Sequence, residues 1–318
     1  MNNPLTNDLN HILTNTVCLW EDLRGKQIFI TGGTGFFGCW LLESFAWAND
    51  RFKLDTSVLV LTRDPDAFRR NAPHLASNPA IQFLTGDVRT FEFPPGEYSH
   101  IIHAAPLGTQ HTLDFAVYCK ARKFLLTSSG AVYGSPLSEY GKEKIEAERL
   151  CAVYAKQYDI DAMIARCFAF VGPYLPLDAH FAIGNFIQDA IRGDPIQVKG
   201  DGTPYRSYLY AADLAIWLWT ILFRGESCRL FRGESCNTYN VGSAEALTIA
   251  DLARLVAQTI GTLGDVKIAK TAVSGQPIER YVPDIHKTET ELNLHQWIGL
   301  PESIRRTVQW HTAMGEER

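Results

Sequence analysis

The sequence lacks three features that mark membrane, nucleic-acid-binding and secreted proteins. No apolar run approaches the roughly 18 residues that a membrane-spanning helix needs. Lysine and arginine (30) do not outnumber aspartate and glutamate (35), so no positive excess is available for nucleic acid or anionic lipid. Residues 1–25 contain Asp8, Glu21 and Asp22 and no long apolar run, so we expect no secretory signal.

Cysteine is sparse and shows no spacing pattern. Its number is odd, and no two cysteines form a C-x-x-C pair. This distribution predicts neither a disulfide framework nor a metal site, and it favours a reducing, cytoplasmic location. The cysteines are Cys18, Cys39, Cys119, Cys151, Cys167, Cys228 and Cys236.

The chain does contain short, nearly continuous apolar runs of strand length. They lie at residues 27–31, 57–63, 81–87, 100–105 and 123–129, with helical or loop patterns between them. This alternation predicts an α/β fold, a doubly wound parallel sheet of Rossmann type covered on both faces. After residue 172 prolines and irregular strands follow, so we expect an NAD(P)-binding domain at 1–172 and a smaller substrate domain at 173–318.

A glycine-rich turn joins the first predicted strand to a helix. Gly32, Gly35 and Gly38 form G-x-x-G-x-x-G, with Phe36 and Phe37 inside the motif. Glycines let the backbone turn tightly and approach a pyrophosphate, whose charge then meets the helix N-terminus. An ordinary tight turn is the competing interpretation, but the strand before and the helix after favour dinucleotide binding.

Two further strand ends bear on the cofactor. Asp87 and Val88 end the third predicted strand, where the carboxylate can accept a hydrogen bond from an adenine amino group. Arg63 follows the second strand and suits the 2′-phosphate of NADP, whereas Asp64 could hold the ribose of NAD. NAD and NADP are both compatible with these residues, and Arg63 favours NADP. The alternative is that Arg63 is an ordinary solvated charge.

The segment "SSGAVYGSPLSEYGKEK" (128–144) contains three groups that could form a proton relay. Tyr140 and Lys144 are four residues apart and so share a helix face, and Ser129 ends the fifth predicted strand. A tyrosine with an ordinary pKa near 10 is a poor base at pH 7, and we expect a nearby ammonium and the positive nicotinamide ring to lower that pKa. The alternative is a turn that leads into an ordinary charged helix.

A series of short motifs extends over most of the chain. They are "TGGTGFFG" (31–38), "GDV" (86–88), "HAA" (103–105), "SSGAVYG" (128–134), "YGKEK" (140–144), "RCFAFVGP" (166–173), "DGTPYRSYLYAADLA" (201–215), "YNVG" (239–242) and "RYVPDIHKTETEL" (280–292). Together they resemble an extended short-chain dehydrogenase/reductase of the NAD(P)-dependent nucleotide-sugar epimerase/dehydratase family. The resemblance implies Ser129, Tyr140 and Lys144 as the catalytic set. It also places Lys144 on the nicotinamide ribose and His103, Ala104 and Ala105 beside the cofactor.

The resemblance also implies a substrate site and an assembly. Arg206 and Arg280 correspond to clamps on the diphosphate of a nucleotide sugar, a task that suits the planar guanidinium fork. Asn185, in "AIGNF", and Ser129 are further expected substrate contacts. The implied assembly is a homodimer, with no nucleic-acid or membrane partner.

Three departures from the family pattern narrow the expected reaction. Gly130 and Ala131 occupy the place of the Asp-Glu pair that related 4,6-dehydratases carry, and Ala169 replaces an asparagine. The segments after Ala105 and Gly134 are short, through either a trimmed enzyme or residues missing from the sequence. We therefore expect an epimerase or 4-keto reductase acting at carbon 4 of a nucleotide-linked hexose. The alternatives are a dehydratase or decarboxylase of the same family, or a non-catalytic NAD(P)-sensing module.

One local repeat has no place in this scheme. "LFRGESCR" (222–229) is followed at once by "LFRGESCN" (230–237). We interpret it as a local tandem duplication in a surface connection, since loops tolerate insertions, and assign it no chemistry.

Overall fold

The computed structural model describes residues 3–179, 181–230, 236–261, 266–273, 275 and 277–316. The chain divides into two compact units. The first comprises Met1–Cys167, Ala215–Asn240 and Lys287–Asn293, and the second comprises Phe168–Leu214, Val241–His286 and Leu294–Arg318. The first unit therefore also includes two segments from the second half of the chain. The functional division at residues 172/173 stays a prediction.

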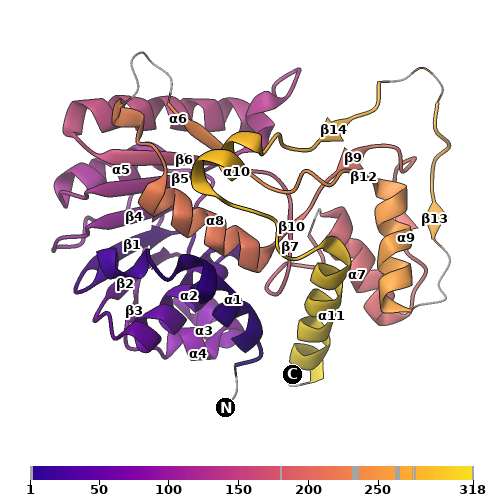
Figure 1. Cartoon of the computed structure of the whole chain (residues 1–318), viewed down its shortest axis with the longest axis horizontal. Helices are drawn as coiled ribbons and strands as arrows, with labels where there is room; N and C mark the ends of the chain where they lie inside the picture. Colours follow the sequence, from indigo (N-terminus) through magenta and orange to yellow (C-terminus); the bar gives the residue numbers. More distant parts are fainter. Residues whose placement is uncertain are drawn as a thin grey trace. The chain divides into compact units, whose positions relative to one another are not determined.

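A seven-stranded sheet forms the centre of the first unit (Figure 1). Its order is β11-β6-β5-β4-β1-β2-β3, and β3 through β6 pair in parallel. The prediction of a doubly wound, Rossmann-type sheet is confirmed. The order reverses between β1 and β4, the place where such sheets bind ligands at the carboxyl ends of their strands. The strands are β1 (Gln27–Thr31), β2 (Ser57–Thr62), β3 (Ile81–Thr85), β4 (His100–His103), β5 (Lys123–Ser129), β6 (Asp161–Cys167) and β11 (Thr238–Val241).

Helices cover both faces of this sheet, because its strands are apolar on both sides. On one face lie α5 (Thr109–Tyr118) and α6 (Glu139–Tyr158), and on the other α1 (Thr6–Thr16), α2 (Phe36–Phe52) and α8 (Ala211–Arg224) (Figure 1). Trp219 of α8 donates to Ser44 of α2 at 2.8 Å and packs on Trp20 of η1 (Trp20–Leu23), which fixes α8 against α2. Two short helices, α3 (Pro65–Asn71) and α4 (Pro73–Ala76), lie between β2 and β3. Among the described residues no helix is long and apolar enough to span a membrane.

The second unit is built from three packed helices and short strand pairs. The helices are α7 (Ala182–Arg192), α9 (Ile249–Ile260) and α11 (Leu300–Glu316). The strand pairs are β7 (Phe170–Val171) with β10 (Leu209–Tyr210), and β8 (Gln197–Val198) with β13 (Lys267–Ile268). A three-stranded sheet has the order β12 (Leu247–Thr248), β9 (Tyr205–Arg206), β14 (Arg280–Tyr281). The short helix α10 (His286–Leu292) begins at His286, the last residue of one segment of this unit, and its other residues belong to the first unit.

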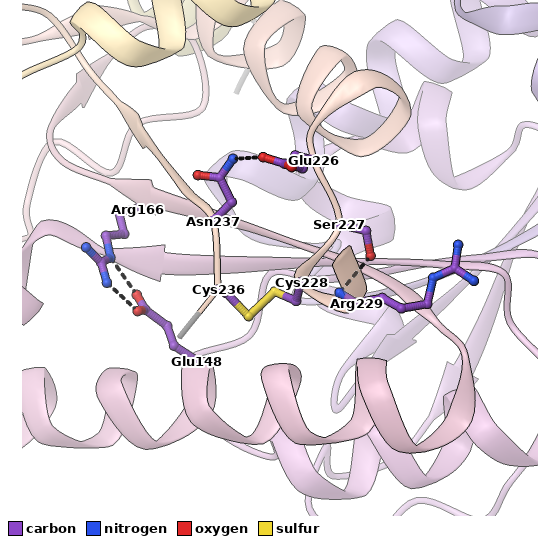
Figure 2. Close-up of a disulfide and its surroundings, with 8 residues drawn as sticks. All are labelled: Glu148, Arg166, Glu226, Ser227, Cys228, Arg229, Cys236 and Asn237. Atoms are coloured by element: carbon purple, nitrogen blue, oxygen red, sulfur yellow. Dashed lines mark hydrogen bonds and ion pairs between the residues drawn. A yellow bond between two sulfur atoms is a disulfide. The ribbon is translucent and has the colours of Figure 1, made fainter. Parts of the chain in front are cut away.

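The duplicated segment contains a disulfide between Cys228 and Cys236 (Figure 2). The expectation that the chain has no disulfide is therefore wrong. The two cysteines hold the same position in the two copies, and the chain folds back so that their Cα atoms are 4.5 Å apart, within bridging range. Cys228 opens η3 (Cys228–Leu230), which packs against α6 and β6, and its side chain is fully buried. Residues 231–235 of the second copy lie outside the described residues.

Candidate active site

The glycine-rich turn lies between β1 and α2, at the point where the sheet order reverses. A Cβ on Gly32 would come within 2.6 Å of the Ala104 backbone, and one on Gly38 within 2.3 Å of Gly33, so the fold itself requires both glycines. Gly35 is different, because an added Cβ would meet only the Gly32 carbonyl oxygen at 3.5 Å. Gly35 is also the N-cap of α2, with no side-chain cap and no acidic residue in the first turn. These features fit a pyrophosphate that approaches the α2 N-terminus, flanked by Phe36 and Phe37.

Charged groups gather at the ends of β2 and β3. Asp87 accepts from the backbone and guanidinium of Arg89 at 2.8–2.9 Å. These hydrogen bonds, with a smaller contribution from the charge of Arg63, hold the pKa of Asp87 well below its usual range. Asp64 caps α3 by accepting from the Ala67 amide at 2.8 Å. The carboxylate that sequence analysis offered to a ribose is thus engaged locally, whereas Arg63 is exposed.

His103 is a buried structural residue at the end of β4. Its ring nitrogens contact the hydroxyls of Thr31 at 2.7 Å and Thr109 at 3.1 Å. Burial, with the charge of Lys144 second, lowers the pKa of His103 to about 3, so the ring is neutral. It thereby fixes the strand end that continues into Ala104 and Ala105, the wall beside the expected cofactor. In the described part of the chain no three His, Cys, Asp or Glu side chains are grouped to hold a metal ion.

The structure brings the three relay residues together where β5 meets α6. Ser129 is buried at the last position of β5, and its hydroxyl hydrogen-bonds to Tyr140. The buried Lys144 ammonium donates to the Thr127 carbonyl at 3.1 Å and lies 5.7 Å from the Tyr140 ring centre. The eleven-residue step between Ser129 and Tyr140 therefore permits the expected contact.

The start of α6 is fixed by local sequence. Ser138 is its N-cap and accepts from the Gly141 amide at 3.0 Å. A Cβ on Gly141 would come within 2.7 Å of the Ala131 carbonyl oxygen in η2 (Gly130–Tyr133). Glycine beside the tyrosine thus lets the first turn of α6 approach the turn that follows Ser129, and this close approach sets the two hydroxyls against each other.

Burial shifts the pKa values of two relay residues. Burial raises the pKa of Tyr140, and the hydrogen bond from Ser129 only partly offsets it. Burial also lowers the pKa of Lys144. In the chain by itself, loss of hydration at the phenol end outweighs the favourable contacts, so Tyr140 carries its proton at neutral pH. The predicted lowering of its pKa depends on the nicotinamide charge as well as on the ammonium, so it stays a prediction for the complex with the dinucleotide.

The shortened segment after Ala105 borders a cavity of about 550 Å³ in the first unit. Only residues 106–108 separate "HAA" from α5, whose N-cap is Gly108 at a φ of +79°. A Cβ on Gly108 would come within 2.6 Å of the Val88 carbonyl oxygen, so glycine allows the direct path. Pro106 to His111 line the cavity, whereas residues 134–139 do not. The α6 side of its lining is Glu143, Glu146, Ala147 and Leu150.

The expected substrate residues lie in the second unit. Arg206 and Arg280 occupy neighbouring strands, where Arg206 pairs with Tyr281 and Arg280 with Tyr205. Successive strand residues face opposite sides, and each guanidinium lies over the ring of its partner tyrosine, so the two arginines are on opposite faces.

The partners of these residues also differ. Arg206 donates to Glu279 at 2.8 Å and to the Tyr205 carbonyl at 2.9 Å, whereas Arg280 is an exposed residue. Asn185 donates to the carbonyls of Leu177 and Ala179 at 2.9 and 2.8 Å, which holds the loop before α7. Among the expected substrate contacts in this unit, Arg280 is the most accessible.

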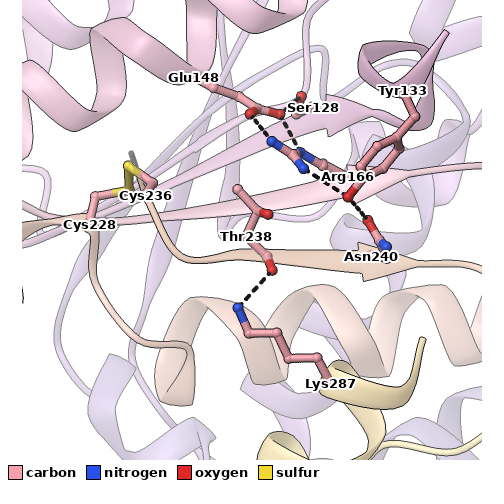
Figure 3. A network of polar contacts seen from close by, with 9 residues as sticks. All are labelled: Ser128, Tyr133, Glu148, Arg166, Cys228, Cys236, Thr238, Asn240 and Lys287. Atoms are coloured by element: carbon pink, nitrogen blue, oxygen red, sulfur yellow. Dashed lines mark hydrogen bonds and ion pairs between the residues drawn. A yellow bond between two sulfur atoms is a disulfide. The ribbon is translucent and has the colours of Figure 1, made fainter. Parts of the chain in front are cut away.

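Sequence analysis missed two features near the site. One is Arg89, which binds Asp87; its place two residues after that aspartate was the available signal. The other is the buried ion pair of Glu148 and Arg166 (Figure 3). Glu148 lies four residues after Lys144 and eight after Tyr140, so the helical period alone placed it on the same stripe.

The fold and the arrangement of Ser129, Tyr140 and Lys144 resemble those of extended short-chain dehydrogenases/reductases. Residues 96–242 match the model of the NAD dependent epimerase/dehydratase family. The matched residues make up just under half of the chain, and the match shows a likeness to that family.

Curated relatives resemble the chain in sequence, and solved structures resemble it in fold. UDP-glucuronic acid decarboxylase 1 of Arabidopsis thaliana is 28% identical over 317 residues, which cover 89% of this chain and 69% of that one. The epimerase Mth375 of Methanothermobacter thermautotrophicus superposes with a TM-score of 0.76 at 20% identity, covering 96% and 97% of the two chains. UDP-glucuronic acid 4-epimerase from Bacillus cereus, solved with UDP-glucuronic acid and NAD, gives 0.73 at 22% identity, covering 91% and 99%.

Proposed function

We propose that this protein oxidises and reduces carbon 4 of a nucleotide-linked hexose with NAD or NADP, as an epimerase or a 4-keto reductase. The observation that carries the proposal is the Ser129–Tyr140 hydrogen bond beside the buried Lys144 ammonium. This relay lies at the carboxyl edge of the same sheet that presents the glycine cradle. A non-catalytic sensing module would need the cradle but has no use for the relay.

The residues have separate tasks in this proposal. When bound, an oxidised nicotinamide dinucleotide supplies the hydride acceptor and a positive charge beside Tyr140. Ser129 holds the oxygen on carbon 4, and Tyr140 takes its proton in oxidation or returns a proton in reduction. Lys144 supports the phenolate form of Tyr140 and holds the nicotinamide ribose. When the 4-keto sugar rotates in the site, it is reduced on its opposite face. This reduction inverts the configuration at carbon 4.

We assign the dinucleotide to the first unit. The proposed pyrophosphate site is Gly32, Gly35, Phe36, Phe37 and Gly38, and the proposed adenosine site is Arg63, Asp87 and Val88. His103, Ala104 and Ala105 form the wall beside the nicotinamide. NADP is the favoured dinucleotide, because Asp64 is engaged as a helix cap while Arg63 is exposed next to Arg89.

We assign the diphosphate of the substrate to Arg280 and Arg206. Arg280 is proposed as the main ligand because it is exposed, and Arg206 as a second ligand that first exchanges its bond to Glu279. Asn185 acts in this proposal through the loop that it holds at Leu177 and Ala179.

Decarboxylation of a nucleotide-linked uronic acid is the second candidate. The curated relatives at 24–28% identity carry the name UDP-glucuronic acid decarboxylase. Oxidation at carbon 4 of such a sugar places a ketone β to its carboxylate, from which carbon dioxide can leave. Dehydration is disfavoured, because Gly130 and Ala131 have no group that can give a proton to a leaving hydroxyl.

Incubation of the purified protein with UDP-glucose or UDP-glucuronic acid and each dinucleotide separates these candidates. NMR spectra over time distinguish an epimer, a pentose formed with loss of carbon dioxide, and a 4-keto-6-deoxy sugar. An epimer, or reduction of a supplied 4-keto sugar, supports the main proposal, and a pentose supports the second. A 4-keto-6-deoxy product would contradict both.

We also propose a homodimer. The cytoplasmic location was expected from a lack of disulfides, and with the Cys228–Cys236 bridge present it stays a prediction only. Large apolar side chains are exposed along α5 and α6, among them Tyr118, Ile145, Val153 and Tyr158. Light scattering coupled to size-exclusion chromatography tests the dimer, and a monomer at micromolar concentration would contradict it.

A further inference from the structure

Three consecutive residues of β5 are each bonded to one stripe of α6. The Thr127 carbonyl accepts from Lys144, the Ser128 hydroxyl donates to Glu148 at 2.5 Å, and the Ser129 hydroxyl contacts Tyr140. The three α6 residues are spaced by four, so they lie one above another on the helix. Two of the three contacts involve the proposed relay, and the third involves a residue that has no part in proton transfer.

Glu148 is fixed by a second element. Arg166 of β6 donates to both of its carboxylate oxygens, at 2.9 and 2.6 Å, in the bidentate geometry that gives direction as well as strength (Figure 3). Ser128 and Arg166 are direct neighbours across the parallel pair of β5 and β6. The Glu148 and Arg166 side chains are 11% and 21% exposed, so the pair is largely removed from water.

Arg166 also reaches the turn that follows the proposed catalytic serine. It donates to the Tyr133 hydroxyl at 2.8 Å, and that hydroxyl donates to Asn240 of β11 at 2.9 Å (Figure 3). Tyr133 ends η2, the turn that begins directly after Ser129. Arg166 therefore links the end of β5, the turn after it, α6 and β11.

A buried ion pair is weak evidence for stability, because well-packed apolar residues of similar volume often stabilise a protein as much. What such a pair does supply is a defined geometry between the elements that carry it. A misplacement of about 1 Å in a reacting group can reduce a rate by about 10². An ion pair that fixes α6 against the end of β5 therefore benefits the rate, although burying the pair costs desolvation energy.

We propose that Glu148 and Arg166 are positioning residues for the Ser129–Tyr140–Lys144 relay. The pair holds the Tyr140–Lys144–Glu148 stripe of α6 at one height against β5, which sets the Tyr140 hydroxyl on Ser129. The proposal rests on the function proposed above.

The pair also acts on Lys144 through its charge. Burial lowers the pKa of Lys144, and the nearby acidic groups, Glu148 among them, raise it. Loss of the Glu148 charge therefore lowers this pKa further, so the ammonium is lost at a lower pH. The groups that face Lys144 are Cys167 on β6, Glu143, Glu148 and Cys151 on α6, His103 on β4 and the ring of Tyr140.

The test is Glu148→Gln, which keeps the shape and removes the charge. We expect kcat to fall by about 10–100-fold, with KM and the dinucleotide Kd within about twofold. The alkaline limb of the kcat profile should move to lower pH. Glu21→Gln, in an exposed pair with Arg24 outside the site, is the matched control and should change neither. If Glu148→Gln does not fold, Ser128→Ala is the alternative test. It removes only the Ser128–Glu148 hydrogen bond, and we expect it to lower kcat by about 3–10-fold.

A folded Glu148→Gln with wild-type kcat and an unchanged pH profile would overturn the proposal. So would a loss confined to thermal stability. A crystal structure of this variant gives an answer without turnover, since the proposal requires the Ser129–Tyr140 hydrogen bond to lengthen or break. Absence of turnover in the wild type on any nucleotide sugar would instead refute the proposed function, and the crystallographic comparison would still decide the positioning role.

Discussion

Tyr140 is a half-exposed residue whose phenol end is buried against Ser129. Tyr140→Phe keeps the ring and removes the oxygen, so we expect turnover to fall by about 10²–10⁴, the usual scope of general acid–base catalysis. Dinucleotide affinity should not change. Tyr158→Phe, an exposed tyrosine at the far end of the same helix, is the matched control. Steady-state rates and calorimetry measure both effects, and near-normal turnover in Tyr140→Phe would remove this residue from the mechanism.

Arg280 is the most exposed of the expected substrate contacts. Arg280→Ala should weaken nucleotide-sugar binding by about 1.5–3 kcal/mol, the range for a hydrogen bond to a charged group. Dinucleotide binding should stay the same. Arg254→Ala, an exposed arginine on α9 that is paired with Asp251, controls for loss of surface charge in the same unit. If calorimetry shows equal losses for both ligands, Arg280 supports the fold and not the substrate.

Arg63 distinguishes the two dinucleotides. Arg63→Ala should raise the Kd for NADP by about 10–100-fold, because the 2′-phosphate loses a charged partner, and leave the Kd for NAD within about twofold. Arg69→Ala, on α3, offers a nearby exposed control. Fluorescence titration of the reduced dinucleotides gives both constants. A parallel change in the two would mean that Arg63 does not read the 2′ position.

Sequence predicted the relay residues but not their environment. Ser129, Tyr140 and Lys144 lie within one short segment, so strand and helix periods suffice to bring them together. The direction of the Tyr140 pKa depends on burial, which only the packed structure determines. Arg166 and Glu148 are eighteen positions apart on different elements, and no local pattern joins them. The opposite faces of Arg206 and Arg280 follow from the β9–β14 register, which sequence does not provide.

At the level of elements, apolar runs located the five strands from β1 to β5 to within two residues at their ends. The strands β1, β2, β4 and β5 are mostly buried, so their sequence signal is nearly continuous, whereas β3 at the edge of the sheet is partly exposed. The disulfide escaped prediction because counting cysteines assumes a spacing pattern typical of secreted domains. Here the pair arises from two copies of one segment, and only the fold-back of the chain brings them together.

The bridge closes a short loop between η3 and β11, and we expect a measurable gain in stability from it. Cys236→Ser, or a thiol reductant, should lower the free energy of unfolding by about 2–3 kcal/mol, the loop-closure entropy for a cross-link of this separation. Urea denaturation with and without reductant measures the change. Reductant should have no further effect on Cys236→Ser, and identical curves for the oxidised and reduced wild type would contradict the expectation.

For the whole molecule, buried histidines set the response to acid. Burial lowers the pKa of His100 and His103 to about 3, so the unfolded chain binds protons at these sites before the folded one does. Their contribution is fully present above about pH 6.5 and is lost as the pH falls, at about 1.4 kcal/mol per pH unit for each residue. His74 acts in the opposite sense, since its hydrogen bond to Glu43 raises its pKa; that pair stabilises below about pH 6.5 and weakens as the pH rises.

The two buried histidines outweigh the single exposed one, so we expect the free energy of unfolding to fall steeply between pH 6.5 and pH 5. Urea denaturation at several pH values measures the slope. His100→Gln removes one titrating group and should reduce the slope by about 1.4 kcal/mol per pH unit. A slope that this variant leaves unchanged would show that His100 does not govern the acid response.

The duplicated "LFRGESC" segment has a consequence at the level of the gene. Copying a stretch that encodes one cysteine supplies its partner in the same event, one repeat length away and in frame. Without duplication, the second cysteine would have to arise by an independent codon change within bridging range of the first. Deletion of either copy would likewise remove the bridge in one step and leave the remaining reading frame intact. A single duplication or deletion can therefore create or remove the whole cross-link.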